Sequence, residues 1–245
     1  LMIEMITDGH PAPPGLADEV ADYVDRSTGI LTIKQMAWLA EAVRRYGLAA
    51  TPKSARAYKR IYNERLLKPV RARVAQLDGS DAARDTLMIA GARDFLAALR
   101  ARGVRLYLAS GTDHAYVLEE AAALGVTDFF EGRIFGAQDR EDAMSKADVI
   151  AKILADHDLH GSELVVVGDG PVEIRHGRAH GAVTLGVAAD EDARAGLNPR
   201  KRRRLLDAGA DMVVTDFRHA EELVTMLTGG GKLAGNEPSE SNTSR

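Results

Sequence analysis

The chain has 245 residues, and its 45% hydrophobic and 28% charged residues are typical of a globular protein, not of a disordered or collagen-like chain. Its formal net charge is only −4, from 32 basic and 36 acidic residues, so the overall charge does not favour a polyanion and nucleic acid is not an expected partner. The absence of cysteine excludes disulfides, thiolate zinc sites, iron–sulfur clusters and cysteine nucleophiles.

The first residues, 1–7, have neither the basic start nor the length of a signal peptide. No run along the sequence approaches the roughly 20 apolar residues that cross a bilayer. We therefore expect a cytoplasmic protein without a membrane partner.

The segment from about residue 15 to residue 75 has apolar residues at helical spacing, for example Ile33, Met36, Leu39, Ala40 and Val43. A break near Gly29 and a new start near Ser54 divide this segment into separate helices. The stretch 77–85, with a glycine and several aspartates, is a predicted linker. We expect a small all-helical domain at residues 1–85.

After residue 85, short apolar runs of strand length alternate with helical stretches. The predicted strands are Val104–Ala109, Leu164–Val167, Ala182–Val187 and Met212–Thr215. The predicted helices are Ala90–Arg102, Tyr116–Leu124, Lys146–His157, Lys201–Ala208 and Ala220–Leu227. This alternation predicts an α/β domain with a mainly parallel sheet at residues 86–228. Residues 229–245 are expected to form a disordered tail.

Ser110, Gly111 and Thr112 follow the first predicted strand. Open parallel sheets bind ligands beyond the carboxyl ends of their strands, so these hydroxyl and backbone N–H groups can bind an anion. The alternative is that Ser110 or Thr112 caps the helix that follows. The local sequence leaves both interpretations open.

Asp169 and Glu173 lie four residues apart, directly after the apolar run 165–167, and glycines flank Asp169 on both sides. Glycine lets a ligand approach the backbone closely, and Mg²⁺ prefers a few carboxylates together with water and phosphate oxygens. The pair therefore indicates a magnesium site. The alternative is a tight turn in which Asp169 caps a helix and Glu173 is exposed to solvent.

Lys146 is at the start of a predicted helix, where a positive side chain opposes the helix dipole. This placement indicates a bound anion, although a solvated surface lysine is the commoner explanation for any single lysine. Two other features have structural interpretations. Asp216 is predicted to cap a helix, and the basic run 200–204 is predicted to be a solvated helix face.

Taken in order, three features resemble the second, third and fourth motifs of the haloacid dehalogenase-like hydrolases. They are Ser110 after a strand, Lys146 at a helix start, and the acidic pair Asp169 and Glu173 after a strand. The resemblance covers roughly residues 91–227. It implies a Rossmann-like three-layer α/β core with a mainly parallel sheet, and the preceding helical stretch resembles the cap of these enzymes.

The resemblance also implies roles for individual residues. Ser110, with Gly111 and Thr112, would bind a phosphoryl oxygen. Lys146 would neutralise charge on the phosphoryl group and on the nucleophile. Asp169 would bind Mg²⁺, with Glu173 supporting the metal.

The first motif of the family has no match in this sequence. That motif is an aspartate nucleophile at the end of the central strand, followed two residues later by an aspartate acid/base, and Asp8 lacks the second aspartate. Leu1–Ile6 is similar to the end of the helix that follows the motif, so we expect a chain that lacks the central strand. Because each unpaired buried backbone group costs about 1–3 kcal/mol, the sheet is expected to be incomplete, rearranged or completed by another chain.

The expected function is that of a Mg²⁺-dependent phosphomonoesterase that acts on a small phosphorylated metabolite through an aspartyl-phosphate intermediate. Without its nucleophile the chain is expected to be inactive alone. One alternative is a non-catalytic binding or regulatory module derived from such a phosphatase. Another is a nucleotide-binding Rossmann-like domain, but neither glycine cluster fits the GxGxxG pattern. The sequence does not indicate the substrate or the oligomeric state.

Overall fold

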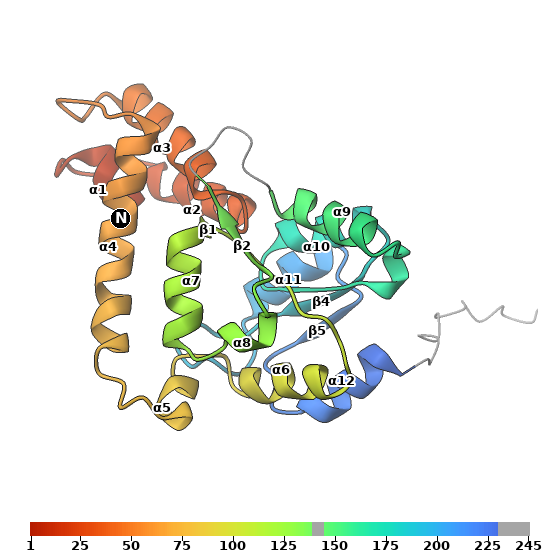
Figure 1. The fold of residues 1–245 in the computed structure, drawn as a ribbon. Helices are drawn as coiled ribbons and strands as arrows, with labels where there is room; N and C mark the ends of the chain where they lie inside the picture. Colours follow the sequence, from red (N-terminus) through yellow and green to blue (C-terminus); the bar gives the residue numbers. More distant parts are fainter. Residues whose placement is uncertain (139–144, 230–245) are drawn as a thin grey trace, which may run out of the picture.

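The computed structural model describes residues 1–138 and 145–229 (Figure 1). The first helices are α1 (Met2–Thr7), α2 (Leu16–Ser27), α3 (Thr32–Tyr46), α4 (Ala55–Val74) and α5 (Asp81–Asp85). They are followed by α6 (Ala92–Ala101), β1 (Leu108–Asp113), α7 (His114–Ala123), α8 (Thr127–Phe130) and β2 (Ile134–Ala137). The remaining elements are α9 (Lys146–Asp156), the 3₁₀ turn Gly161–Glu163, β3 (Val165–Gly168), α10 (Pro171–Ala179), β4 (Val183–Val187), α11 (Pro199–Asp207), β5 (Met212–Val214) and α12 (Ala220–Thr228).

Helices α1 to α4 pack around an apolar core of their own. Its members that are wholly inaccessible to solvent include Ile6, Leu16, Met36, Leu39 and Val43. In α3 these residues follow the helical spacing of the sequence, which explains why the helix buries one face. Helix α4 begins where expected, because the Ser54 hydroxyl accepts a hydrogen bond from the backbone N–H of Ala57 at its amino end.

The strands form two separate parallel sheets within the described ranges. β1 pairs with β2, while β4 lies between β3 and β5. No backbone pairing joins β1 to β3 in the described part of the chain. The α/β fold class with parallel strands is confirmed, and so is the expectation of an interrupted sheet.

One apolar core continues from one sheet to the other. The same buried cluster contains residues of α6, α7, β2, β4 and α12, among them Phe95, Val117, Ile134, Leu185 and Val224. A smaller cluster joins α10 to α11 through Ile174 and Leu205. The two sheets are therefore held together by side-chain packing rather than by backbone hydrogen bonds.

Strands β1 and β2 differ from the sequence-based expectation. β1 begins at Leu108 rather than Val104 and continues to Asp113, because β2 pairs with it along this stretch with an irregular register. β2 was not predicted, since it has only four residues and one of them is Gly136. The Ser110–Thr112 segment therefore lies inside an extended strand, not at the start of a helix.

The predicted linker 77–85 contains the short helix α5. The Ser80 hydroxyl accepts a hydrogen bond from the backbone N–H of Ala83. Ser80 is therefore the N-cap residue of a helix that begins within the predicted linker. The domain boundary after residue 85 stays a prediction. Of the expected tail, residues 230–245 lie outside the described part of the chain. No helix that the structure describes is both long and apolar enough to cross a membrane.

Asp216 does not cap helix α12 as predicted, because that helix begins at Ala220 and His219 precedes it. The buried Asp216 carboxylate instead accepts hydrogen bonds from the backbone N–H of Arg218, at 3.0 Å, and from its guanidinium, at 2.8 Å. These hydrogen bonds, chiefly from the Arg218 side chain, lower the pKa of Asp216 from 3.8 to about 2. Asp216 therefore stabilises the turn between β5 and α12.

We expect this carboxylate to make stability depend on acid pH. A lowered folded-state pKa stabilises the fold above the unfolded pKa near 4, and this contribution is lost as the pH falls toward 2. Between pH 5 and pH 2.5 the free energy of unfolding of the wild-type chain should fall by about 1–2 kcal/mol more than that of Asp216→Asn. This range is reduced because Arg218 is exposed and solvent weakens its interaction with Asp216. Urea unfolding at the two pH values measures the difference. Arg218→Gln should remove the same pH dependence, and parallel pH profiles of the wild type and Asp216→Asn would contradict the assignment.

Candidate active site

Gly111, Lys146 and Glu173, from three separate stretches of sequence, lie next to one loop of the helical domain. This loop, residues 28–30, lies in the connection between α2 and α3. A Cβ atom added to Gly29 would overlap the Glu173 carboxylate and would lie 3.5 Å from Lys146 Nζ. A Cβ atom added to Gly111 would lie 2.5 Å from the Ile30 carbonyl oxygen. The loop therefore touches the Ser110–Thr112 strand on one side and the Lys146–Glu173 pair on the other.

Ser110, Gly111 and Thr112 lie half-buried at the carboxyl end of β1. The Ser110 hydroxyl accepts a hydrogen bond from the Thr112 backbone N–H at 3.2 Å, and the Thr32 hydroxyl donates one to the Gly111 carbonyl at 3.3 Å. Helix α7 begins only at His114, so neither Ser110 nor Thr112 caps it. A serine hydroxyl whose oxygen is held by the Thr112 N–H thus lies near the carboxyl end of the strand, where parallel sheets bind ligands.

Lys146 is not a freely solvated lysine. It is the first residue of α9, where the Ser145 hydroxyl and the Asp148 carboxylate form a capping box that fixes the helix start. The Lys146 side chain is only 17% exposed, and its ammonium donates a hydrogen bond to Glu173 Oε2 at 3.1 Å. The solvated-surface interpretation of Lys146 therefore does not hold, and the sequence did not indicate its pairing with Glu173, while its role at the site stays a prediction.

Glu173 is buried and both of its carboxylate oxygens have partners. Oε2 binds Lys146, and Oε1 accepts a hydrogen bond from the Gly170 backbone N–H at 2.9 Å. A Cβ atom at Gly168 would overlap the Glu173 side chain, so glycine is required for this close approach. Glu173 therefore joins the β3–α10 turn to α9, and the interpretation of Glu173 as a solvent-exposed residue is wrong.

Asp169 follows β3 and is open to solvent, with its side chain 58% exposed. The described residues contain no group of three or more His, Cys, Asp or Glu side chains placed to hold a metal ion. A magnesium ion does not need such a group, since it is commonly held by one or two carboxylates, water and substrate phosphate. Asp169 fits that pattern, whereas Glu173 already uses both oxygens in protein contacts.

Lys201 is a residue of the site that the sequence interpretation missed. It belongs to the basic run predicted to be solvated, yet it is buried, and its ammonium lies 3.2 Å from Asp169 Oδ2 and 2.9 Å from Glu191 Oε1. Burial by itself lowers the pKa of Lys201, but hydrogen bonds and the charges of Glu191 and Asp169 outweigh burial and raise it. The prediction of a solvated face is therefore wrong at Lys201.

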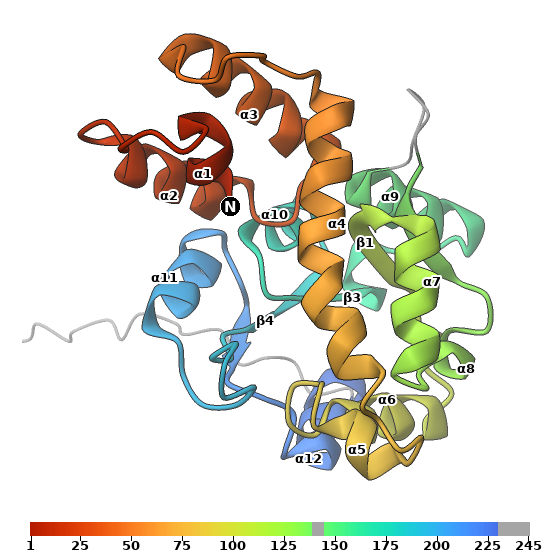
Figure 2. The same ribbon diagram turned by 90° about the vertical axis from the view of Figure 1, so that its left-hand side faces the viewer.

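The helical domain is also tied to the α/β domain beside the candidate site. The buried Lys59 of α4 forms an ion pair with Asp113 at the end of β1, and Asn63 donates a hydrogen bond to Asp113 at 3.2 Å. Further along, α4 runs beside α7 (Figures 1 and 2), where Arg71 pairs with Glu119. These contacts hold the helical domain over the carboxyl end of β1.

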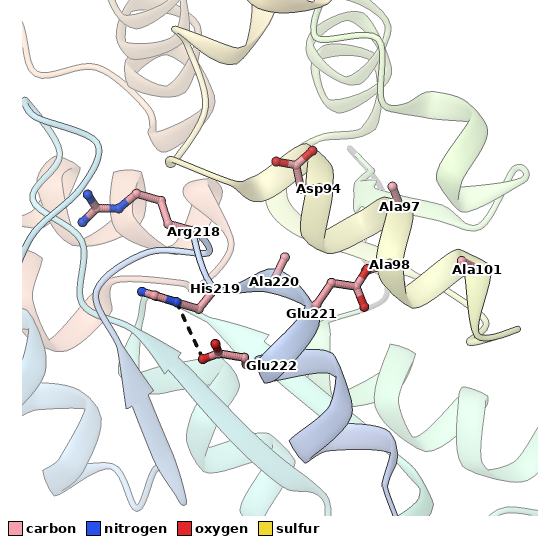
Figure 3. Close-up of a pocket in the computed structure, with 9 residues that line it drawn as sticks. All are labelled: Asp94, Ala97, Ala98, Ala101, Arg218, His219, Ala220, Glu221 and Glu222. Carbon is pink, nitrogen blue, oxygen red and sulfur yellow. Dashed lines mark ion pairs between the residues drawn. The ribbon is translucent and has the colours of Figure 1, made fainter.

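A pocket of about 620 Å³ lies elsewhere, between α6 and the start of α12 (Figure 3). Its walls include Asp94, Ala98 and Ala101 from α6, and Arg218 and Glu221 from the other side. None of the residues predicted from the sequence as catalytic, substrate-binding or metal-binding lines this pocket. It is therefore separate from the candidate site.

Comparison with protein families gives a match to the haloacid dehalogenase-like hydrolases over residues 6–181. The chain belongs to this family. The match spans most of the helical domain, β1, α9 and the β3–α10 turn, and so covers Ser110, Lys146, Asp169 and Glu173, whereas Lys201 lies beyond it. Comparison with curated proteins gives no match.

Solved structures share the fold at low sequence identity. A predicted phosphoglycolate phosphatase from Haemophilus somnus 129PT is 14% identical with a TM-score of 0.58, and 92% of this chain and 89% of that one are covered. A haloacid dehalogenase-like hydrolase from Streptococcus pneumoniae is 19% identical, with a TM-score of 0.52 and coverage of 92% and 88%. A hydrolase of the same family from Deinococcus radiodurans R1, solved with bound phosphate and sodium, is 17% identical, with a TM-score of 0.52 and coverage of 92% and 88%.

These comparisons establish the family and the fold. The individual roles of Ser110, Lys146, Asp169 and Glu173 stay predictions that rest on the geometry around the 28–30 loop.

Proposed function

We propose that this chain carries the phosphate- and metal-binding part of a Mg²⁺-dependent phosphomonoesterase that acts on a small phosphorylated metabolite in the cytoplasm. The observation that carries the proposal is the convergence of the Ser110–Thr112 strand, Lys146 and Glu173 on one loop of the helical domain. A hydroxyl, backbone N–H groups and an ammonium at one place suit a dianionic phosphoryl group. Neither nucleic acid nor a membrane is proposed as a partner.

In this proposal the Ser110 hydroxyl donates a hydrogen bond to a phosphoryl oxygen, the Gly111 N–H binds alongside it, and Thr112 orients the hydroxyl through its own N–H. Thr112 N–H now donates to the Ser110 oxygen, which leaves the serine proton available for an acceptor. Lys146 neutralises phosphoryl charge, and its bond to Glu173 keeps the ammonium directed at the site. In phosphoryl transfer the protein contributes mainly positioning and charge stabilisation, which these groups supply.

Asp169 would hold the magnesium ion, with water and phosphate oxygens completing its surroundings. When bound, the ion supplies charge neutralisation for the transferring phosphoryl group. Glu173 would support this arrangement indirectly, through the Gly170 N–H and Lys146.

The nucleophilic aspartate would come from a strand placed between β1 and β3. The facing edges of these strands have no backbone partners in the described part of the chain, and paired edges are strongly preferred in a sheet interior. An aspartate at the carboxyl end of such a strand would lie among Ser110, Lys146 and Asp169. The chain alone is therefore proposed to be inactive.

The test is hydrolysis of p-nitrophenyl phosphate by the chain with and without a peptide that has an apolar β-branched segment followed by Asp-x-Asp. We expect no hydrolysis by the chain alone, and Mg²⁺-dependent hydrolysis with the peptide that disappears in Asp169→Asn. Ser110→Ala in the same mixture should lower kcat by about 10²–10³, the usual effect of one lost oxyanion donor. The matched control peptide has Asn-x-Asp, which keeps the strand but removes the nucleophile.

Two outcomes would contradict the proposal. Hydrolysis by the chain alone that is lost in Asp169→Asn would place the nucleophile within this sequence. Phosphate binding without hydrolysis in either mixture would favour the non-catalytic binding or regulatory module.

A further inference from the structure

The buried ammonium of Lys201 contacts Asp169, the proposed metal-binding carboxylate, from the protein side. Lys201 is only 4% exposed, and it lies in the first turn of α11, two residues after Pro199. Burial of a positive charge is costly, and the amino end of a helix adds unfavourable positive potential. An ammonium at this position therefore needs acidic partners close by.

Its partners are two carboxylates that themselves face solvent. Lys201 Nζ lies 3.2 Å from Asp169 and 2.9 Å from Glu191, whose side chains are 58% and 77% exposed. A cation that arrives from solvent can thus reach the Asp169 carboxylate that Lys201 already binds from the protein side. Two positive charges near one carboxylate repel each other, so the ammonium and the cation compete for it.

Glu191 remains a partner for the Lys201 ammonium when Asp169 binds a cation. A pocket of about 230 Å³ adjoins the three charged groups and is otherwise lined mainly by apolar side chains, including Val187 and Phe217. Glu191 is on the loop after β4, whereas Asp169 follows β3, so the two acidic partners belong to different segments. Lys201 can therefore keep its bond to Glu191 while Asp169 turns toward solvent.

We propose that the Lys201 ammonium is an internal competitor of the divalent cation at Asp169. It neutralises Asp169 in the metal-free protein, and cation binding transfers this carboxylate from Lys201 to the metal while Lys201 stays with Glu191. The inference rests on the proposed role of Asp169 in metal binding. Its consequence is a cation affinity below that of the carboxylate alone, so that a higher cation concentration is needed to half-fill the site.

The experiment measures Mn²⁺ binding to the full chain from the electron paramagnetic resonance signal of free Mn²⁺. Lys201→Gln should tighten Mn²⁺ binding by about tenfold, or about 1.4 kcal/mol, because the competing charge is gone. The gain should vanish in the double variant Lys201→Gln/Asp169→Asn. The matched control is Arg203→Gln, which removes the same charge from an exposed position of α11 and should leave Mn²⁺ affinity nearly unchanged.

Glu191→Gln tests the competition by removing the second acidic partner of Lys201. Lys201 would then have Asp169 as its one acidic partner, so Mn²⁺ binding should weaken severalfold. Thermal unfolding of each variant checks that it is folded, and Lys201→Met serves as a second variant if the glutamine destabilises the buried position.

Failure of this inference can be distinguished from failure of the proposed function. If the wild type binds Mn²⁺ through Asp169 but Lys201→Gln binds no tighter than Arg203→Gln, the competition is refuted while the metal site stands. If Asp169→Asn leaves Mn²⁺ binding unchanged in the wild type and in Lys201→Gln, both proposals are refuted.

Discussion

Replacing Glu173 with alanine is expected to lower the free energy of unfolding by about 3 kcal/mol, since breaking one partner of a largely buried ion pair leaves an uncompensated charge. Two losses contribute. The Lys146 ammonium, 17% exposed, loses its hydrogen bond to Oε2, and the Gly170 N–H loses its acceptor Oε1. A buried donor without a partner costs about 1–3 kcal/mol by itself. Urea unfolding followed by circular dichroism measures the change.

A surface ion pair of the same chain provides the matched control. Glu119 pairs with Arg71 at 3.1 Å, but the two side chains are 54% and 57% exposed. Glu119→Ala should therefore cost no more than about 0.5 kcal/mol. Glu173→Gln keeps an oxygen for the Gly170 N–H and should fall between the two alanine variants. Equal losses for Glu173→Ala and Glu119→Ala would show that the Lys146–Glu173 pair does not organise the site.

The elements found from the sequence are those whose pattern is local. The apolar runs of β3 and β4 and the helical period of α3 can be read within a few residues, because each pattern lies in consecutive sequence. β2 and the true start of β1 depend instead on pairing between Leu108 and Ile134, which are far apart in sequence. No window around either strand contains that information.

The same distinction explains what the sequence indicated about the site. Lys146 was recognisable because a lysine at a helix start is locally unfavourable. Lys201 is in an equally unfavourable place, but its arginine neighbours made the run resemble a solvated face, and its partner Asp169 is on another element. Glu173 was found from its spacing to Asp169, yet its bonds to Lys146 and Gly170 could not be read from that spacing.

Gly29→Ala is expected to lower the free energy of unfolding by about 2–3 kcal/mol and to move the 28–30 loop away from the site. Gly29 has a φ of +95°, and a left-handed backbone costs a residue with a Cβ about 1–2 kcal/mol. The added methyl group would also overlap Glu173 Oε2. A flexible carboxylate could normally give way, but this one is held by Lys146 and by the Gly170 N–H, so a shift would weaken both hydrogen bonds.

The control variant Gly47→Ala separates the backbone cost of a positive φ from the overlap with Glu173. Gly47 has a φ of +64° at the end of α3, and a Cβ atom there would meet nothing within 4 Å. Gly47→Ala therefore should cost only the backbone contribution of about 1 kcal/mol. The excess loss in Gly29→Ala, measured by urea unfolding, reports the contact with the Lys146–Glu173 pair. It should shrink in a Glu173→Ala background, because the overlapping oxygen is then absent and only the contact with Val172 Cβ, at 3.2 Å, remains. An excess that stays undiminished there would mean that the loop is held by something other than the Lys146–Glu173 pair.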